Sequence, residues 1–572
     1  MPPLPAPLRR DLEKVVVQAR NLAEKAAADA VRAMTVADAK AGSHLDAAGQ
    51  ALRRRLRAHA RQLGDPRDPK TGRQGTDRLV REAAYEHWHR MLFARFLAEN
   101  DLLIEPDAGV AVSLEELEEL AQEDPATAPG TQGDPWRLAS RFAQRMLPQI
   151  FRTDDPALEL PLAINDRNRL QALVQGLAPE TFDADDALGW VYQFWQKEEK
   201  DRVNASGDKI TGDSLPAVTQ LFTEHYMVQF LIDNTIGAWW AGKKMADGGF
   251  RMADFPTEQS CRDALALPGY TFDYLRFIRD EPVGVDDNAD AESDSHPPSD
   301  IPHPPSSGPW TPAAGTFPTW PRDAAGLTVL DPSCGSGHFL VAVFQLLVRL
   351  RMEEQGLPLP DAVDAVLRDN LFGLEIDPRC TQIAAFNLAL AAWKLTGYRP
   401  LPGLQVACCG LAPRSTREDW LEMAERTLAD HPAHEREPLR RGLIHMHELF
   451  SDAPELGSLI DPNELPAEGF AADFETLRPV LDAVLRAETD DAEARERAVA
   501  ARGMAEAAQI LSARRGNGQD EGAEGYTLVI TNVPYLGRGN QGETLTSFVE
   551  TQYKHAKADL ATVFVDRMLK WV

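Results

Sequence analysis

Cysteine is scarce in this chain, with five among 572 residues. Their odd number, their scatter and the absence of C-x-x-C spacing fit neither a disulfide framework nor a zinc site. We therefore expect no metal site and a reducing compartment, the cytoplasm. The five are Cys261, Cys334, Cys380, Cys408 and Cys409.

Long apolar runs are also missing. The amino-terminal segment MPPLPAPLRRDLEKVVV lacks the hydrophobic core of a signal peptide, and no run approaches the roughly 20 apolar residues that a membrane span needs. The sequence therefore predicts a soluble protein with no membrane partner.

An excess of basic residues is lacking as well, because 88 acidic residues outweigh 60 basic ones and give a net charge of -28. This balance excludes a protein whose whole surface clamps nucleic acid, but it leaves room for a local basic groove. The length predicts roughly two to four domains, since a single core does not grow to this size.

The amino-terminal region is alanine-rich and charged, and its apolar residues recur every three or four positions. This pattern predicts helix over residues 8–62. The densest basic cluster of the chain begins there, and two interpretations fit it: a solvated helix face, or a surface that contacts DNA phosphates. The candidates for phosphate contact are Arg53, Arg54, Arg55, Arg57 and Arg61.

The composition changes several times along the chain. Residues 103–135 are acidic and rich in Pro, Gly and Thr, which predicts a loop. A later stretch of Asp, Ser and Pro cannot bury enough apolar surface to offset its ordering entropy, which predicts a disordered linker. Beyond it, short apolar strands alternate with helices, as in a parallel sheet covered on both faces. The expected regions are a helical amino-terminal region at 1–180, a helical segment at 181–280, the linker at 281–322, and an α/β domain at 323–572 with a helical insertion at about 415–524.

A glycine-rich turn, Asp331-Pro332-Ser333-Cys334-Gly335-Ser336-Gly337, follows the first of these strands and opens a helix. Glycine lets a ligand approach the backbone, and the helix amino terminus offers N–H groups. Leu340 stands where a dinucleotide fold has a third glycine, so the turn favours a nucleoside over a pyrophosphate. The next strand ends in Glu375, which is placed to accept hydrogen bonds from ribose hydroxyls, while Asp377 before Pro378 is typical of a helix N-cap.

Three motifs in this order, D-P-x-C-G-S-G-x-F, G-L-E-I-D-P and N-x-P-Y, resemble those of S-adenosylmethionine-dependent DNA methyltransferases that act on the exocyclic amine (N6) of adenine. The segments GWVYQFWQKEEKD and ADLATVFVDRML are similar to the large methyltransferases of phage-defence systems, of the BREX (PglX-like) and DISARM types. The resemblance implies a class I methyltransferase fold, Rossmann-like with a mostly parallel sheet. It implies action on double-stranded DNA in phage defence or restriction-modification.

The same resemblance assigns roles to residues. It implies that Thr223 helps to hold the methionine carboxylate of S-adenosylmethionine. The residues implied to hold the flipped adenine are Asn532, Val533, Pro534 and Tyr535. The implied cofactor pocket is completed by Asp331, Pro332, Cys334, Gly335, Ser336, Gly337, Glu375 and Ile376.

The sequence departs from the family pattern at several points. Val533 replaces the first proline of the tetrapeptide, although the role of that position needs only its backbone carbonyl. Glu224 follows Thr223 where the relatives have proline, and Gly410 follows Cys409 where relatives often carry an acid. The chain also stops at FVDRMLKWV, where relatives continue with further strands. We therefore expect an incomplete sheet that a missing carboxy-terminal half or another defence-system subunit completes.

Two other functions stay open at this point. A planar glutamine amide poses the same chemical problem as the adenine amine, which allows methylation of a protein glutamine. Val533 and the missing carboxy-terminal strands allow instead a catalytically weak or inactive subunit that binds cofactor or DNA.

Overall fold

The structure is a computed structural model that describes the whole chain except residues 1–3, 125–132, 149, 151, 153, 185, 213, 220–222, 249–253, 280–308, 430, 463–473, 487–490 and 514–524. The chain divides into two compact units. The first unit comprises Met1–Phe222, Thr328–Val341 and Leu371–Val572, and the second comprises Thr223–Leu327 and Ala342–Asn370. None of the helices among the described residues combines the length and apolar character needed to cross a membrane.

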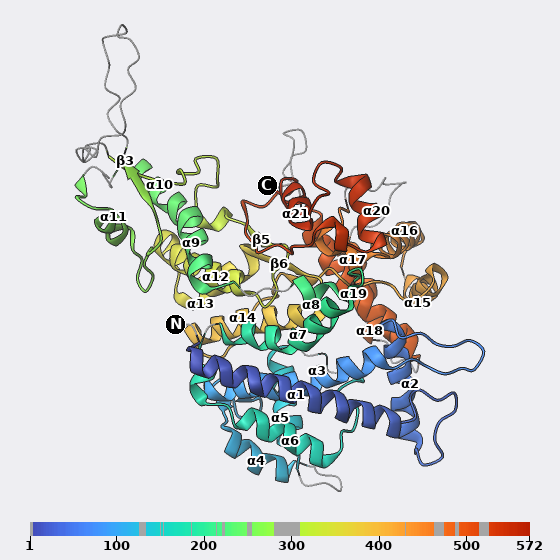
Figure 1. The fold of residues 1–572 in the computed structure, drawn as a ribbon. Helices are drawn as coiled ribbons and strands as arrows, with labels where there is room; N and C mark the ends of the chain where they lie inside the picture. Colours follow the sequence, from blue (N-terminus) through green and yellow to red (C-terminus); the bar gives the residue numbers. More distant parts are fainter. Residues whose placement is uncertain are drawn as a thin grey trace. The chain divides into compact units, whose positions relative to one another are not determined.

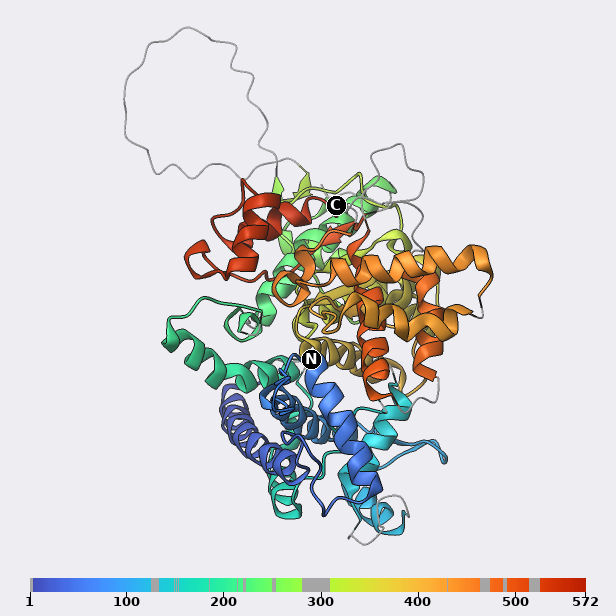
Figure 2. The ribbon, with the colours of Figure 1, turned by 90° about the vertical axis from the view of Figure 1, so that its right-hand side faces the viewer.

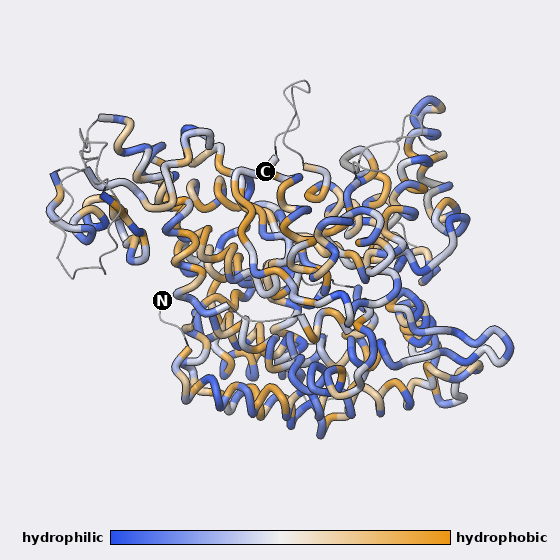
Figure 3. The backbone as a smooth tube through the Cα atoms, turned by 45° about the horizontal axis from the view of Figure 1, so that its top comes forward, coloured by the Kyte–Doolittle hydropathy of each residue, from blue (hydrophilic) through white to orange (hydrophobic). Residues whose placement is uncertain are grey.

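The amino-terminal part of the first unit is mainly helical (Figure 1). Helix α1 packs against α3, α6 and α7. Hydrophobic residues alternate with hydrophilic ones along the helices (Figure 3), so one face of each enters the core. The elements are α1 Ala6–Ala33, α2 Ala47–Gln62, α3 Asp77–Glu99, β1 Ile104–Glu105, β2 Val110–Ala111, α4 Leu114–Glu123, α5 Pro135–Met146, α6 Ile164–Gln175, the 3-10 turn Pro179–Thr181, α7 Ala187–Ser206 and α8 Leu215–Thr219.

The single helix predicted over residues 8–62 is interrupted between α1 and α2. Thr35 adopts a positive φ of 50°, which ends α1, and Asp46 starts α2 as an N-cap that accepts the amide of Gly49. A helical hydrophobic period on both sides of a short break does not reveal the break itself.

The loop predicted over residues 103–135 is also wrong in part. The antiparallel pair β1–β2 lies within it, and α4 follows. Ser113 and Glu116 form a capping box that fixes the start of α4. The acidic composition concealed this signal, because five glutamates lie among the ten residues of α4.

The sheet of the first unit has the strand order β7-β6-β5-β8, and all of its strands run parallel. The register places Val329 opposite both Leu371 and Leu528. The strands are β5 Val329–Asp331, β6 Leu371–Glu375, β7 Val406–Cys408 and β8 Leu528–Val529. The predicted parallel α/β sheet is thus confirmed, and the carboxyl ends of its strands share one edge.

Helix α14, Pro378–Thr396, ties this sheet to the amino-terminal helices. Phe93 of α3 stacks on Phe386 of α14 with ring centroids 3.9 Å apart, inside one shared core. The helices that follow β7 pack against one another, drawn in orange in Figure 2, and α19 also contacts β7 and β6. Helix α12, His338–Gln355, begins in the first unit and belongs to the second from Ala342 onward. Further elements of the first unit are α15 Arg417–Ala429, α16 Ala433–Leu449, α17 Ala453–Leu456, the 3-10 turn Gly457–Leu459, α18 Phe474–Arg486, α19 Ala492–Leu511, the 3-10 turn Arg538–Asn540, α20 Glu543–Gln552 and α21 Leu560–Met568.

The second unit is built around a long interrupted helix. Helix α9 His225–Ile232 runs through a π-helical turn, Asp233–Gly237, into α10 Ala238–Ala246. The other elements are α11 Glu258–Leu265, β3 Phe277–Arg279, β4 Trp310–Pro312, the 3-10 turn Ala324–Gly326 and α13 Leu359–Asp369.

The predicted linker at 281–322 falls mostly on residues 281–308, which lie outside the described residues. Its last part is ordered, because β4 pairs antiparallel with β3. The Arg279 guanidinium lies 4.1 Å from the centroid of the Trp310 ring, so an aromatic residue anchors this end.

Candidate functional site

The glycine-rich turn and the acid at the end of β6 meet at the carboxyl edge of the sheet. The amide of Gly335 donates a 2.8 Å hydrogen bond to Oε2 of Glu375. The amides of Ile376 and Asp377 donate to Oε1 of the same carboxyl at 2.9 and 3.0 Å. Glu375 is only 4% exposed, and its burial raises its pKa to about 7.

Asp331 is a second buried acid beside the same turn. Its Oδ1 accepts the amide of Ser333 at 3.2 Å, whereas its Oδ2 has no hydrogen-bond partner among the described residues. The hydroxyl of Thr531, from the loop after β8, lowers the pKa of this carboxyl, although the two groups do not meet the geometry of a hydrogen bond. Burial, aided by the charge of Glu375, raises the pKa of Asp331 to about 7.

The two glycines of the turn have different surroundings. Both have a positive φ, +52° at Gly335 and +79° at Gly337. A Cβ on Gly335 would meet nothing within 4 Å, whereas a Cβ on Gly337 would lie 3.0 Å from Cα and Cβ of Ala384 in α14. Gly335 therefore faces open space, and Gly337 allows close packing of the turn against a helix.

The other predicted pocket residues lie in the same stretch. Cys334 is buried, and its amide donates to the carbonyl of Leu374 at 2.9 Å. The carbonyl of Ser336 accepts the side-chain amide of Asn387 at 3.2 Å. Pro332 lies within the turn, and Ile376 follows Glu375 directly. These two hydrogen bonds fix the turn against β6 and α14.

Asp377 has the capping role predicted for it. Its Oδ1 accepts the amide of Arg379 at 2.9 Å as the N-cap of α14. Burial alone would raise the pKa of Asp377, but the Arg379 guanidinium holds it below its usual value. The hydroxyl of Tyr192, from α7, also donates to this carboxyl. Sequence reasoning missed Tyr192, because a tyrosine in an apolar helix carries no signal of a partner 185 residues away.

The tetrapeptide predicted to hold the adenine follows β8, the strand that pairs with β5. Pro534 is buried, Asn532 and Val533 are half-buried, and the Tyr535 side chain is 63% exposed. Val533 packs against the core formed with the insertion helices, which gives a structural reason for valine at this position. The structure therefore brings this loop to the same edge of the sheet as Asp331.

Thr223 belongs to the second compact unit. Its predicted contact with the methionine end of the cofactor stays a prediction.

The amino-terminal arginines are largely engaged within the fold. Arg53 and Arg57 are 7% and 8% exposed. Arg53 Nε donates to the carbonyl of Thr35 at 2.9 Å, and Arg57 Nη1 donates to the carbonyls of Val36 and Asp38 at 2.6 Å each. For these two residues the prediction of phosphate contact is wrong, because their guanidiniums close the break between α1 and α2.

The remaining three arginines differ. Arg55 donates to Glu159 at 2.8 and 2.9 Å, and Arg61 pairs with Glu493. Arg54 is exposed, and its predicted phosphate contact stays a prediction.

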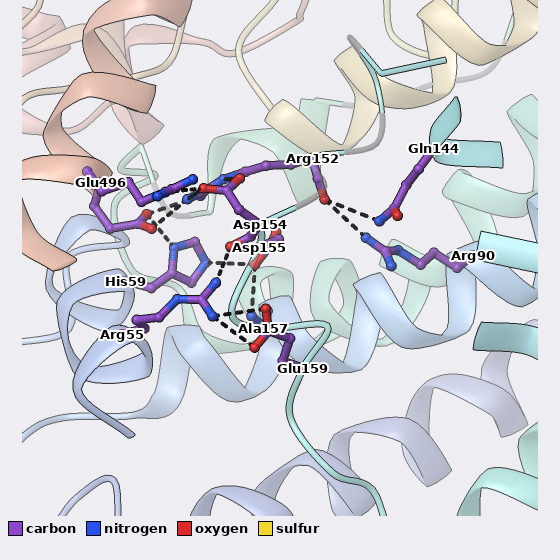
Figure 4. A network of polar contacts seen from close by, with 11 residues as sticks. Arg55, His59, Arg90, Gln144, Arg152, Asp154, Asp155, Ala157, Glu159 and Glu496 are labelled. Atoms are coloured by element: carbon purple, nitrogen blue, oxygen red, sulfur yellow. Dashed lines mark hydrogen bonds and ion pairs between the residues drawn. The ribbon is translucent and has the colours of Figure 1, made fainter. Parts of the chain in front are cut away.

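A buried charge network that the sequence did not reveal joins α2 to α19 (Figure 4). His59 Nδ1 lies 2.9 Å from Oε2 of Glu496, and Arg152 Nη2 lies 2.7 Å from its Oε1. Burial alone would lower the pKa of His59, but the charges of Glu496 and Asp155 raise it to about 9. His59 and Glu496 are 437 residues apart, so no local pattern could pair them.

No group of three or more His, Cys, Asp or Glu side chains suited to a metal ion occurs in the described part of the chain.

Comparison with known proteins points the same way as the motifs. Residues 369–572 match the family model of the Eco57I restriction-modification methylase. The chain is 26% identical to the adenine-specific methyltransferase BrxX of Escherichia coli O9:H4 (strain HS) and 24% identical to the adenine-specific methyltransferase PglX of Lacticaseibacillus casei (strain Zhang). The chain is thus similar to the BrxX and PglX methyltransferases. A PglX of Streptomyces coelicolor is 43% identical over 76 residues, 13% of this chain and 6% of that protein.

These alignments cover most of this chain but less than half of each relative. The alignment with BrxX covers 73% of this chain and 31% of BrxX, and the alignment with the L. casei PglX covers 92% and 41%. The chain thus spans less than half the length of these relatives. The methylase match agrees with a class I methyltransferase fold, since the four-stranded parallel sheet carries the glycine-rich turn and the tetrapeptide loop on neighbouring strands.

Proposed function

We propose that this chain forms the catalytic part of an adenine-specific DNA methyltransferase of a phage-defence system. It would move the methyl group of S-adenosylmethionine to N6 of a flipped adenine in double-stranded DNA. One observation carries this proposal: the Gly335–Glu375 pair and the loop Asn532–Tyr535 stand on adjoining strands at one edge of a parallel sheet. The similarity to BrxX and PglX supports it.

The residues at this edge fit a nucleoside cofactor. The position of Gly335 offers open space beside the backbone, and Asp331 Oδ2 is a buried polar atom without a partner among the described residues. Glu375 would hold ribose hydroxyls, and Asp331 would accept a donor from the cofactor. Bound S-adenosylmethionine would supply an electrophilic methyl group.

The loop after β8 would prepare the nucleophile. The adenine amine is a poor nucleophile because its lone pair is delocalised into the ring. The side-chain oxygen of Asn532 and the carbonyl of Val533 can accept its two N–H bonds, which favours a more tetrahedral nitrogen with its lone pair aimed at the methyl carbon. As the new N–C bond forms, the bond from the methyl carbon to the sulfonium sulfur breaks and its electron pair stays on sulfur. The two oxygens would stabilise the positive charge that develops on the amine, which then loses one proton to solvent.

Tyr535 would hold the base itself. Its ring is exposed, which suits a flat face on which a base can stack after leaving the duplex. Pro534, the buried residue that precedes it, would fix the backbone of this turn.

Calorimetric titration with S-adenosylmethionine, together with transfer of a labelled methyl group to unmethylated phage DNA, tests the proposal. We expect binding and label on DNA. Binding without any transfer would support a cofactor-binding subunit instead, and label on protein glutamine would support the alternative substrate. A chain that does not bind S-adenosylmethionine contradicts the proposal.

A further inference from the structure

Three segments lie side by side just beyond Tyr535 in the first unit. Gly537 pairs with Asp559, and Ile210 pairs with Gln541. The loop that follows the tetrapeptide is therefore flanked by the turn before α21 on one side and by the segment after α7 on the other.

These segments gather basic side chains, which we call the basic rim. Its members are Lys209, Arg538, Lys554, His555 and Lys557. All are exposed except Lys557, which is half-buried. Lys209 donates a hydrogen bond to the carbonyl of Gly539, so its ammonium group lies next to the loop after the tetrapeptide.

Two of the acids near the basic rim are engaged, whereas Asp208 and Glu543 are exposed. Glu550 pairs with Arg538, and Asp559 caps α21 by accepting the amide of Ala561 at 2.9 Å. The segment from residue 553 to 558 contains no acid. No ion pair to Lys554, His555 or Lys557 occurs within the described residues, so the charges of the two lysines have no counter-ion there.

Another group of arginines is less suited to an anion. A groove of about 710 Å³ among the amino-terminal helices is lined by Arg32, Arg73, Arg81 and Arg202, but also by Asp38, Asp77 and Glu199. Arg202 pairs with Glu199, and Arg32 pairs with Asp29. The groove therefore has almost as many negative as positive charges.

The basic rim follows Tyr535 closely along the chain. Gly539 lies four residues beyond Tyr535, in the 3-10 turn Arg538–Asn540, and four residues span at most about 13 Å. At about 3.4 Å per nucleotide along one strand, this upper bound corresponds to about four nucleotides. A Cβ on Gly539 would meet nothing within 4 Å, so a phosphate can approach the backbone there.

We infer that the basic rim, chiefly through Lys209, Lys554 and Lys557, binds phosphates of the DNA strand that carries the target adenine, within about four nucleotides of that base. This inference rests on the proposed function, and it names the surface that positions the substrate. The contacts are sequence-independent, because phosphates carry no base identity.

Fluorescence anisotropy with a labelled duplex of mixed sequence, titrated at several NaCl concentrations, tests the inference. The variant is Lys554→Gln with Lys557→Gln. The matched control is Lys14→Gln with Lys25→Gln, which removes two exposed lysines of α1 and changes the charge equally. Each phosphate contact contributes roughly 0.9 to the slope of log affinity against log salt concentration. We expect the variant to lose about two from this slope and roughly tenfold in affinity at low salt, and to keep its S-adenosylmethionine affinity.

The outcomes separate the two claims. A smaller slope in the variant, an unchanged slope in the control and recovery with Lys554→Arg and Lys557→Arg support the basic rim. An unchanged slope in a variant whose wild type binds DNA overturns the basic rim and leaves the proposed function standing. A wild-type chain that binds S-adenosylmethionine but no DNA overturns both.

Discussion

The amide of Gly335 donates a 2.8 Å hydrogen bond to Oε2 of Glu375, which joins the turn after β5 to the tip of β6. With the amides of Ile376 and Asp377, backbone donors fill three of the roughly four acceptor positions of this carboxylate. A ribose that uses both of its hydroxyls must therefore replace one of these three backbone donors. The ligand-free turn and the ligand compete for the same acid.

Gly335→Ala tests whether the open space beside Gly335 holds the ligand, without changing the packing of the turn. The added methyl enters open space where the nucleoside would lie, and a positive φ costs an alanine about 1 kcal/mol. We expect at least a tenfold loss of S-adenosylmethionine affinity by calorimetry with a small change in Tm. Gly337→Ala is the contrast, because its methyl would press on Ala384 and lower the Tm further. Unchanged affinity in Gly335→Ala would show that the cofactor does not bind beside Gly335.

Cofactor affinity should rise with pH. Glu375 and Asp331 have pKa values raised to about 7, so both are largely protonated at about pH 6 and ionised at about pH 8. The ionised carboxylate is the stronger acceptor for hydroxyl donors. We expect affinity to increase by about fivefold to tenfold over this range. Titrations at several pH values check this, and Glu375→Gln should bind more weakly with a flatter profile. A falling affinity would oppose the assignment of these acids.

Tyr535→Ala should abolish methyl transfer and leave cofactor affinity within about twofold, because the exposed ring stacks on the base and not on the cofactor. Tyr535→Phe keeps the flat face and should retain most of the activity. Transfer assays at saturating cofactor compare the two variants. Full activity in Tyr535→Ala would show that the ring does not hold the base.

The His59–Glu496 pair predicts that stability declines at high pH. The folded pKa of His59, about 9, lies above its ordinary value of 6.5, so its contribution is complete below about pH 6.5 and is lost as the pH rises through 9. The expected loss is on the order of 2 kcal/mol. Denaturant unfolding of wild type and His59→Gln at about pH 6.5 and about pH 9.5 measures it. A stability difference between the two proteins that does not shrink at the higher pH would contradict this account.

Much of the site could be predicted because its signals are local. The strand before Asp331, the glycines of the turn and the capping role of Asp377 each rest on a few neighbouring residues. The parallel order of the strands followed from their alternation with helices.

The parts that could not be predicted depend on contacts between distant segments. The arginine cluster of α2 looked like a surface, yet Arg53 and Arg57 are buried because the loop after α1 folds back over them and offers carbonyl acceptors. Tyr192 reaches Asp377, and His59 reaches Glu496, only once the amino-terminal helices have packed on α14 and α19. Composition and periodicity carry no information about such partners.

The most direct test of the account is the nucleoside composition of unmethylated phage DNA after incubation with this chain and S-adenosylmethionine. Mass spectrometry of the digested DNA should detect N6-methyladenine with the wild-type chain and none with Asn532→Ala, whose cofactor affinity should be unchanged. N6-methyladenine formed equally by both proteins, or absent from the wild-type reaction despite cofactor binding, would contradict the central claim that Asn532 to Tyr535 hold the adenine for methyl transfer.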